Sequence, residues 1–155
     1  HETHRQCPDA MVAIGDAKLR LQWLNRLSAF GYQIPFLIHS TAWVSPSAEI
    51  GAGSVVFAGA VVQAQAQVGA GAILNTACSV DHDTQLADGV HICPGAHLAA
   101  DVVVGARSWI GIGSSVINQV CIGSDVTVGA GAAVVRDLPN DVTAVGVPAR
   151  VLLKT

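Results

Sequence analysis

The sequence predicts a mainly β protein built as a solenoid of short strands, and three observations lead to this fold class. A Val, Ile or Leu residue stands at every sixth position from Val44 to Val134, sixteen times in succession without an insertion. Four positions after successive anchors comes a small or slim residue, as at Ala48 and Ala132. The apolar content of 51% includes no run of about 18 apolar residues, so it does not indicate a transmembrane helix. A fixed period of six matches neither a helical turn nor simple strand alternation and is typical of a solenoid.

The first 40 residues are predicted to contain a strand, a helix and a second strand. Residues 11–16 form a short apolar stretch that ends in a turn, and residues 17–30 carry apolar side chains near helical spacing. Asp16 is the expected N-cap of this helix, and Gly31 lies just past its end. With a second strand at 34–38, the segment forms a βαβ unit. Residues 1–40 are therefore expected to be the tail of an α/β domain whose first half lies outside this sequence.

Residues 41–139 are predicted to form the solenoid domain itself. Three hexads per coil give 18 residues per coil and about five coils, which stack at the strand spacing of about 4.8 Å. Small residues, Gly and Asp allow the chain to turn tightly at the corners. The period ends at the turn around Leu138–Asp141, and residues 140–155 follow as a C-terminal arm. Pro148 favours an extended backbone at the residue before it in this arm.

Composition and charge exclude several classes of function. The net charge is −3 and no basic stripe occurs, which argues against nucleic acid as a partner. No signal segment and no membrane segment are indicated. The four cysteines form no CxxC pair and are expected to be free thiols in a cytoplasmic protein; they are Cys7, Cys78, Cys93 and Cys121.

Several blocks of sequence, together with the hexads, resemble the hexapeptide-repeat acyltransferases, whose fold is a left-handed parallel β-helix. The nearer likeness is to the sugar-nucleotide N-acetyltransferases of bacterial glycan synthesis and their sialic acid O-acetyltransferase relatives. This resemblance implies an acetyl-CoA-dependent enzyme with a small Rossmann-like domain of which residues 1–40 would be the tail. The subfamily's Gly-rich opening turn is not present in this sequence. The blocks are residues 37–39, 44–48, 73–76, 80–83, 90–97 and the Val-Gly-Val-Pro-Ala-Arg arm at 145–150.

Acetyl transfer requires a base, and histidine is the natural one at neutral pH. By resemblance, His82 matches the catalytic base of the family, and Asp83 matches the acidic residue that raises its basicity. Strand alternation would send residues 82 and 83 to opposite sides, so the pair can cooperate only where a corner bends the backbone. The alternative is a surface histidine between two solvated aspartates, Asp81 and Asp83.

The resemblance also implies a coenzyme site. His91 matches a residue that contacts acetyl-CoA near the thioester, the alternative being a structural hydrogen bond. Trp109 lies 18 residues later and is expected to stack above His91, as an interface residue or a coenzyme contact. Ile112 and Ala130 match positions whose backbone lines the pantetheine arm. Ala100 is also expected at the coenzyme, because Ala100 and Ala130 stand where relatives often have Gly. Arg150 would either reach the coenzyme phosphates or remain solvated.

Three residues are assigned to the acceptor by the same resemblance. Asn75 is placed near the acceptor sugar, and the alternative is an Asn ladder at a solenoid corner. Gly15 and Asp16 match the nucleotide side of the N-terminal domain, although a plain helix cap is the stronger interpretation of Asp16. The expected acceptor is a nucleotide-linked (UDP-type) amino sugar.

A homotrimer is predicted from apolar residues that should point outward. A patch of this extent usually marks an interface. The family solution is a threefold ring with coenzyme and base in the cleft between neighbouring prisms, and His97 is expected to pack at a subunit face. The outward residues are Val55, Val61, Ile73, Val103, Trp109, Ile112 and Ile117.

The leading hypothesis is thus N-acetylation of a nucleotide-linked amino sugar with a histidine base and no metal. O-acetylation of sialic acid or a related sugar is the nearest alternative. A zinc carbonic anhydrase on the same solenoid would need two histidines five residues apart, whereas His82, His91 and His97 are spaced by nine and six. A non-catalytic trimeric scaffold is the alternative from a different class.

Overall fold

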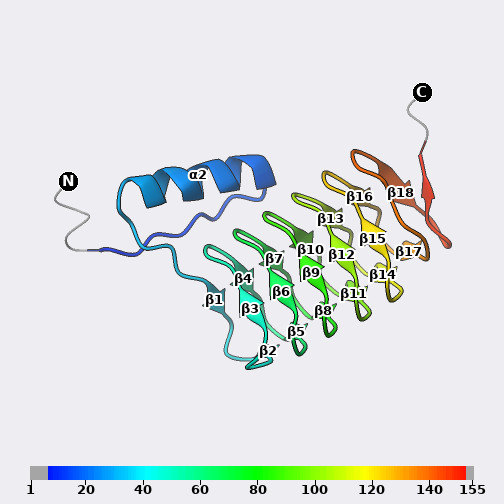
Figure 1. Ribbon diagram of the computed structural model, residues 1–155, viewed down its shortest axis with the longest axis horizontal. Helices are drawn as coiled ribbons and strands as arrows, with labels where there is room; N and C mark the ends of the chain where they lie inside the picture. Colours follow the sequence, from blue (N-terminus) through cyan, green and yellow to red (C-terminus); the bar gives the residue numbers. More distant parts are fainter. Residues whose placement is uncertain (1–6, 153–155) are drawn as a thin grey trace.

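The computed structural model describes residues 7–152 and shows a mainly β, three-sided parallel solenoid with one helix beside it (Figure 1). We call its three faces the first, second and third sheets. The first runs in the order β1 (Leu37–Ile38), β4 (Val55–Val56), β7 (Ile73–Leu74), β10 (His91–Ile92), β13 (Trp109–Ile110), β16 (Thr127–Val128), β18 (Thr143–Val145) and β19 (Arg150–Val151). The second runs in the order β17 (Ala133–Val134), β14 (Ser115–Val116), β11 (His97–Leu98), β8 (Ser79–Val80), β5 (Val61–Val62) and β2 (Trp43–Val44). The third runs in the order β15 (Cys121–Ile122), β12 (Val103–Val104), β9 (Gln85–Leu86), β6 (Gln67–Val68) and β3 (Glu49–Ile50).

The register of the sheets confirms the 18-residue coil. His91 of β10 lies opposite Ile73 of β7 on one side and Trp109 of β13 on the other, and both pairings are parallel. The solenoid has about six coils instead of the five predicted, because β1 forms a rung before the first hexad anchor and β18 adds one after the last. The β18–β19 pair is antiparallel and closes the C-terminal end.

The hexad anchors fill the axis of the prism. Those from Val56 to Val134 are all buried, whereas Val44 and Ile50 at the open end are partly exposed. Outward residues alternate with them, and Trp109 and Ile112 are exposed apolar side chains. We name the three corners of the prism by the sheets they join: Asn75 lies on the first–second edge, His82 on the second–third edge and Gly89 on the third–first edge.

The helix is confirmed, but the βαβ unit around it is not. Helix α2 (Ala17–Ala29) begins at Asp16, whose carboxylate accepts a hydrogen bond of 2.7 Å from the Leu19 amide. Residues 11–16 form no strand, and β1 pairs with β4 of the solenoid rather than with a strand of an N-terminal sheet. Asp9 and Gln33, on either side of the helix, form one isolated parallel bridge, which does not extend into residues 11–16.

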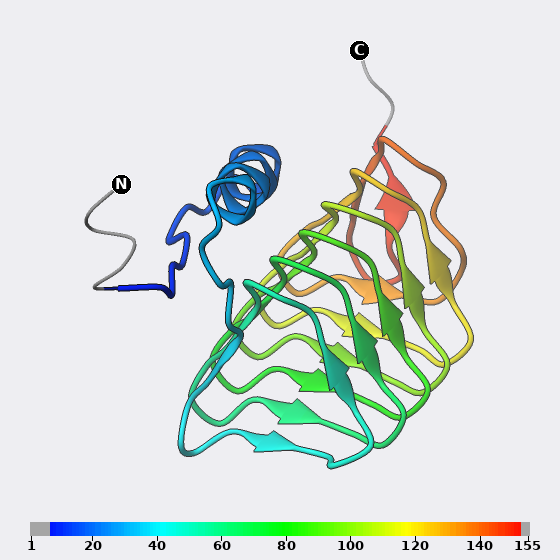
Figure 2. The same cartoon turned by 60° about the vertical axis from the view of Figure 1, so that its left-hand side comes forward.

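The helix lies outside the coils and along the third–first edge (Figure 2). Leu24 is buried there, and a methyl group at Gly53 or Gly71 would come within 2.7–2.8 Å of its side chain. Both glycines also have positive φ values, so this edge needs glycine for two separate reasons. No helix among residues 7–152 is long and apolar enough to cross a membrane.

Candidate active site

His82 and Asp83 form a hydrogen-bonded pair on the second–third edge, between β8 and β9. Asp83 has a φ of +59°, which supplies the corner that strand alternation alone would not provide. His82 Nδ1 lies 2.7 Å from Asp83 Oδ2, and the backbone amide of His82 donates to Asp81 Oδ1 at 2.8 Å. Both side chains of the pair are about half exposed, at 54% and 53%. The imidazole is therefore held by a carboxylate at an open corner.

The electrostatics of this corner favour a basic imidazole. The hydrogen bond to Asp83 is the main cause that raises the pKa of His82 above its ordinary value of 6.5, and the charges of Asp81, Asp83 and Asp101 add to it. A carboxylate accepts and cannot donate, so Nδ1 carries the proton that it shares with Asp83. Nε2 then keeps its lone pair and is available to accept a proton.

His91 lies on the first sheet in a different environment. The ring is 9% exposed, and its Nε2 lies 3.2 Å from Asn75 Nδ2. The Asn75 amide is oriented by the Thr76 backbone amide, which donates to Asn75 Oδ1 at 2.8 Å. Asn75 Nδ2 is therefore the donor to His91 Nε2, and the proton of the neutral imidazole lies on Nδ1. The Trp109 ring lies 4.2 Å from the His91 ring between centroids, as the 18-residue spacing predicts.

Burial, assisted by the charge of Arg20, lowers the pKa of His91 to about 4. The unfolded chain takes up this proton near pH 6.5, so the free energy of unfolding should fall by about 3 kcal/mol between pH 6.5 and about 4. The His91→Gln variant should lose this part of the pH dependence in urea titrations. His39→Gln, at an exposed histidine, is the control. A variant H91Q with the wild-type pH dependence would contradict this assignment.

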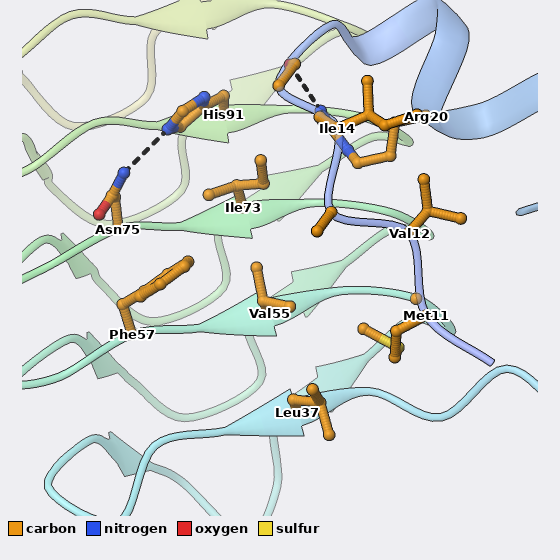
Figure 3. A pocket seen from close by; sticks show the side chains of 13 residues that line it. Met11, Val12, Ile14, Arg20, Leu37, Val55, Phe57, Ile73, Asn75 and His91 are labelled. Atoms are coloured by element: carbon orange, nitrogen blue, oxygen red, sulfur yellow. Dashed lines mark hydrogen bonds between the residues drawn. The ribbon is translucent and has the colours of Figure 1, made fainter. Parts of the chain in front are cut away.

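An apolar cavity of about 330 Å³ lies between the N-terminal segment and the first sheet (Figure 3). Ile14 and Gly15 line one side, and Ile73 lines the other. Asn75 and His91 supply the polar groups at one end of it (Figure 3). A mostly apolar pocket with a few convergent polar groups is the usual form of a small-molecule site.

The remaining predicted residues lie on two edges of the prism and on the terminal strand β19. Ala100 lies on the second–third edge one coil beyond His82, where the amide of Asp101 donates to the His82 carbonyl. Ile112 and Ala130 are exposed on the first–second edge, again one coil apart. Arg150 lies on β19, and its guanidinium donates to the Ala149 carbonyl.

His82 and His91 lie on opposite sides of one prism, because the second–third edge faces away from the first sheet. His82 lies at a corner, and His97 lies on the second sheet with its Nδ1 2.8 Å from Ser79 Oγ. A single copy does not bring the predicted site together.

Two parts of the cavity were missed by the sequence analysis. Arg20 is 1% exposed although it lies on a surface helix. Its spacing of four residues from the buried Leu24 is the signal that places both on the inner face of the helix. The sequence does show an apolar stretch at residues 11–14, but a short apolar run does not distinguish a strand from a segment packed on a surface.

A parallel solenoid of 18-residue coils with a His–carboxylate pair at an open corner defines the class of the hexapeptide-repeat acyltransferases. No family model matches the chain, and no curated protein sequence matches it either. Solved structures do match. The acetyltransferase domain of PglB from Neisseria gonorrhoeae, solved with acetyl coenzyme A, is 49% identical with a TM-score of 0.92, over 93% of this chain and 70% of that one.

Two further structures extend the likeness. A histidine mutant of perosamine N-acetyltransferase from Caulobacter crescentus, in complex with CoA and GDP-perosamine, is 43% identical with a TM-score of 0.92, over 93% of this chain and 69% of that one. WeeI from Acinetobacter baumannii is 26% identical with a TM-score of 0.78, over 92% and 69%. The chain belongs to the hexapeptide-repeat sugar acetyltransferases and is an enzyme of the acetyl-CoA-dependent class.

Proposed function

We propose that the protein transfers the acetyl group of acetyl-CoA to the amino group of a nucleotide-linked amino sugar in bacterial glycan synthesis, with His82 as general base. The observation that carries this proposal is the His82–Asp83 pair at 2.7 Å on an open corner. The similar structures support an amine acceptor over a hydroxyl, since perosamine N-acetyltransferase holds GDP-perosamine. The four free thiols support a cytoplasmic location.

The reaction follows from the lone pair on His82 Nε2. The amine nitrogen attacks the thioester carbonyl carbon, so that a C–N bond forms and the C–S bond breaks. His82 Nε2 takes the proton that leaves the nitrogen, while Asp83 stabilises the imidazolium through Nδ1. The same proton then passes to the CoA thiolate. The products are an acetamido sugar and CoA with a free thiol.

A homotrimer is proposed because one copy separates the groups that must act together. The second sheet lies between the edge that carries His82 and the edge that carries Asn75, Ile112 and Ala130. Three copies packed through their second sheets would bring the second–third edge of each next to the first–second edge of its neighbour. His97 would lie at this subunit face, as expected from the sequence. Closed rings of this kind are common among homo-oligomers.

In this arrangement the coenzyme lies in the groove between two copies. Ile112 and Ala130 of one copy and Ala100 of the other would line it, and Arg150 would approach its phosphates. The acceptor sugar enters from the cavity that Gly15 and Asn75 line. We further propose that the solenoid winds left-handed, that residues 1–40 are part of a Rossmann-like nucleotide domain, that 41–139 are the acetyltransferase domain and that 140–155 are the arm. Residues 1–6 and 153–155 within these bounds lie outside the described residues.

The test is a CoA-release assay over a panel of UDP- and GDP-linked amino sugars, with each product examined by mass spectrometry. An increase of one acetyl group on the sugar nitrogen is the expected result. Matched sugars that carry a hydroxyl in place of the amine are the control. Acetylation of the hydroxyl sugars alone, or of no sugar with purified trimer, would overturn the proposal.

Asp83→Asn should shift the pH profile of kcat/KM as well as lower its plateau. The carboxylate raises the pKa of His82, and a base must be unprotonated, so activity in the wild-type protein should rise as pH increases through a value above 6.5. The neutral amide removes the main cause of the raised pKa, so the acid limb should move to lower pH. Asp101→Asn, one coil away, should move it less. An unmoved acid limb in D83N would argue against the pair.

A further inference from the structure

Arg20 is a cation that the protein buries although it forms no ion pair among the described residues. Its side chain projects from α2 and is 1% exposed. Burial lowers its pKa from the ordinary value, and the charge of Asp16 opposes this shift. Burying a charge without a counter-ion costs free energy of folding, so an arginine at this position needs a compensating role.

The guanidinium of Arg20 donates to four backbone carbonyls from two parts of the chain. Nε donates to Gly71 O at 2.8 Å, and one terminal nitrogen donates to Gly89 O at 3.0 Å. The other terminal nitrogen donates to Ile14 O at 2.9 Å and to Gly15 O at 2.7 Å. Gly71 and Gly89 lie on successive coils of the third–first edge, so Arg20 ties the segment before the helix to two coils of the solenoid.

Apart from Arg20, the backbone of this segment is held at its two ends, where Ala10 donates to Gln33 O at 2.9 Å and Asp16 caps the helix. In the part of the chain that the structure describes, residues 11–15 belong to no strand. Ile14 and Gly15 nevertheless form one wall of the apolar cavity, opposite Ile73 and near the Asn75–His91 pair (Figure 3). The position of that wall relative to His91 is therefore fixed by the planar fork of Arg20, a geometry that a lysine cannot reproduce.

We propose that Arg20 is a positioning residue for the acceptor: it sets the distance between the Ile14–Gly15 wall and the Asn75–His91 pair, and so fixes where the amino sugar lies. This inference rests on the proposed function. It assigns Arg20 to the acceptor side of the site alone, because the first–second edge with Ile112 and Ala130 has no contact with the guanidinium among the hydrogen bonds of residues 7–152.

The experiment compares Arg20→Met and Arg20→Lys with wild type, using acetyl-CoA and the nucleotide-linked amino sugar that the wild-type protein acetylates. Arg20→Met should raise the KM for the sugar by about tenfold or more, since small misplacements of a bound reactant are costly. The KM for acetyl-CoA should stay within about twofold, and Arg20→Lys should lie between wild type and Arg20→Met. Arg26→Met is the control, because Arg26 lies on the same helix but stacks on Trp23 at 4.5 Å.

Hydrogen exchange without substrate provides a readout independent of turnover. Arg20→Met should accelerate exchange of the Ala10 and Gln33 amides, which pair the start of this segment with the chain after the helix, while the strands from β10 onward keep their protection. An unchanged KM for the sugar, or equal increases in both KM values, would overturn the proposal. If Arg20→Met does not fold, a folded Arg20→Lys with wild-type sugar KM would overturn it as well. If wild type acetylates no sugar, the proposed function fails, and unchanged exchange of the Ala10 and Gln33 amides would then refute the positioning role separately.

Discussion

The kcat of the His82→Ala variant is expected to be lower than that of the wild-type protein by a factor of about 10² to 10⁴, while the variant still binds acetyl-CoA. The imidazole is half exposed and takes no part in the core, so its removal should leave the solenoid folded. Stopped-flow or steady-state CoA release gives the rate, and calorimetry with CoA gives the binding constant. Loss of rate with retained binding is the signature of a base rather than of a structural histidine.

The matched control for His82→Ala is Gln119→Ala on the same edge. Gln119 is exposed, lies two coils beyond Asp83 and has a similar positive φ of 61°. Its replacement tests whether any change on this corner disturbs the enzyme, and its kcat should remain at the wild-type level. A His82→Ala protein with wild-type turnover would remove the proposed mechanism and would favour a non-catalytic scaffold.

The Ser115→Arg variant should dissociate into monomers and lose turnover to about the level of His82→Ala. Ser115 is exposed on β14, the second strand from the C-terminal end of the second sheet, and three buried arginines around one axis would repel each other. Gln85→Arg, on the exposed face of the third sheet, is the matched control and should remain trimeric and active. Light scattering and the CoA-release assay would be run on the same samples. A fully active Ser115→Arg monomer would contradict a shared site.

Mixing two inactive variants separates a shared site from a site that merely needs an intact trimer. His82→Ala and Ala130→Phe alter different edges, and Ala130 is exposed on the groove. If each site takes one edge from each of two copies, random trimers should regain about one quarter of the sites. If each site lay within one copy, no mixture would regain activity. Unfolding the two proteins together and refolding them would give the mixed trimers.

The coil and its corners were predictable because a single physical constraint repeats in every hexad. Each anchor must fill a narrow axis, so the period appears in the sequence itself, and the structure places the anchors from Val56 to Val134 in the core. The coil number was underestimated for the same reason. Leu37 and Thr143 belong to strands that lie outside the hexads, and only their pairing with neighbouring strands reveals them.

The candidate site was predicted less completely because it depends on contacts between distant segments. The His82–Asp83 pair was recognisable, since both residues are adjacent in sequence and only the corner remained to be established. Arg20 was not, because its partners Gly71 and Gly89 are main-chain carbonyls more than 50 residues away and leave no side-chain pattern. The separation of His82 from His91 likewise follows from sheet assignment, which spacing alone does not give.

Helix α2 has a consequence for how the molecule opens. In a stack of coils each rung supports only its neighbours, so unfolding can spread inward from either end. Leu21 and Leu24 contact the corners at Gly53, Gly71 and Gly89. They thereby hold together three rungs that would otherwise separate one at a time. The rungs from Gly53 to Gly89 should therefore unfold as one block. The helix reaches the later rungs only through the exposed Lys18–Asp125 ion pair at 4.0 Å among the described residues, so amide exchange should be slower at Ile73 than at Thr127.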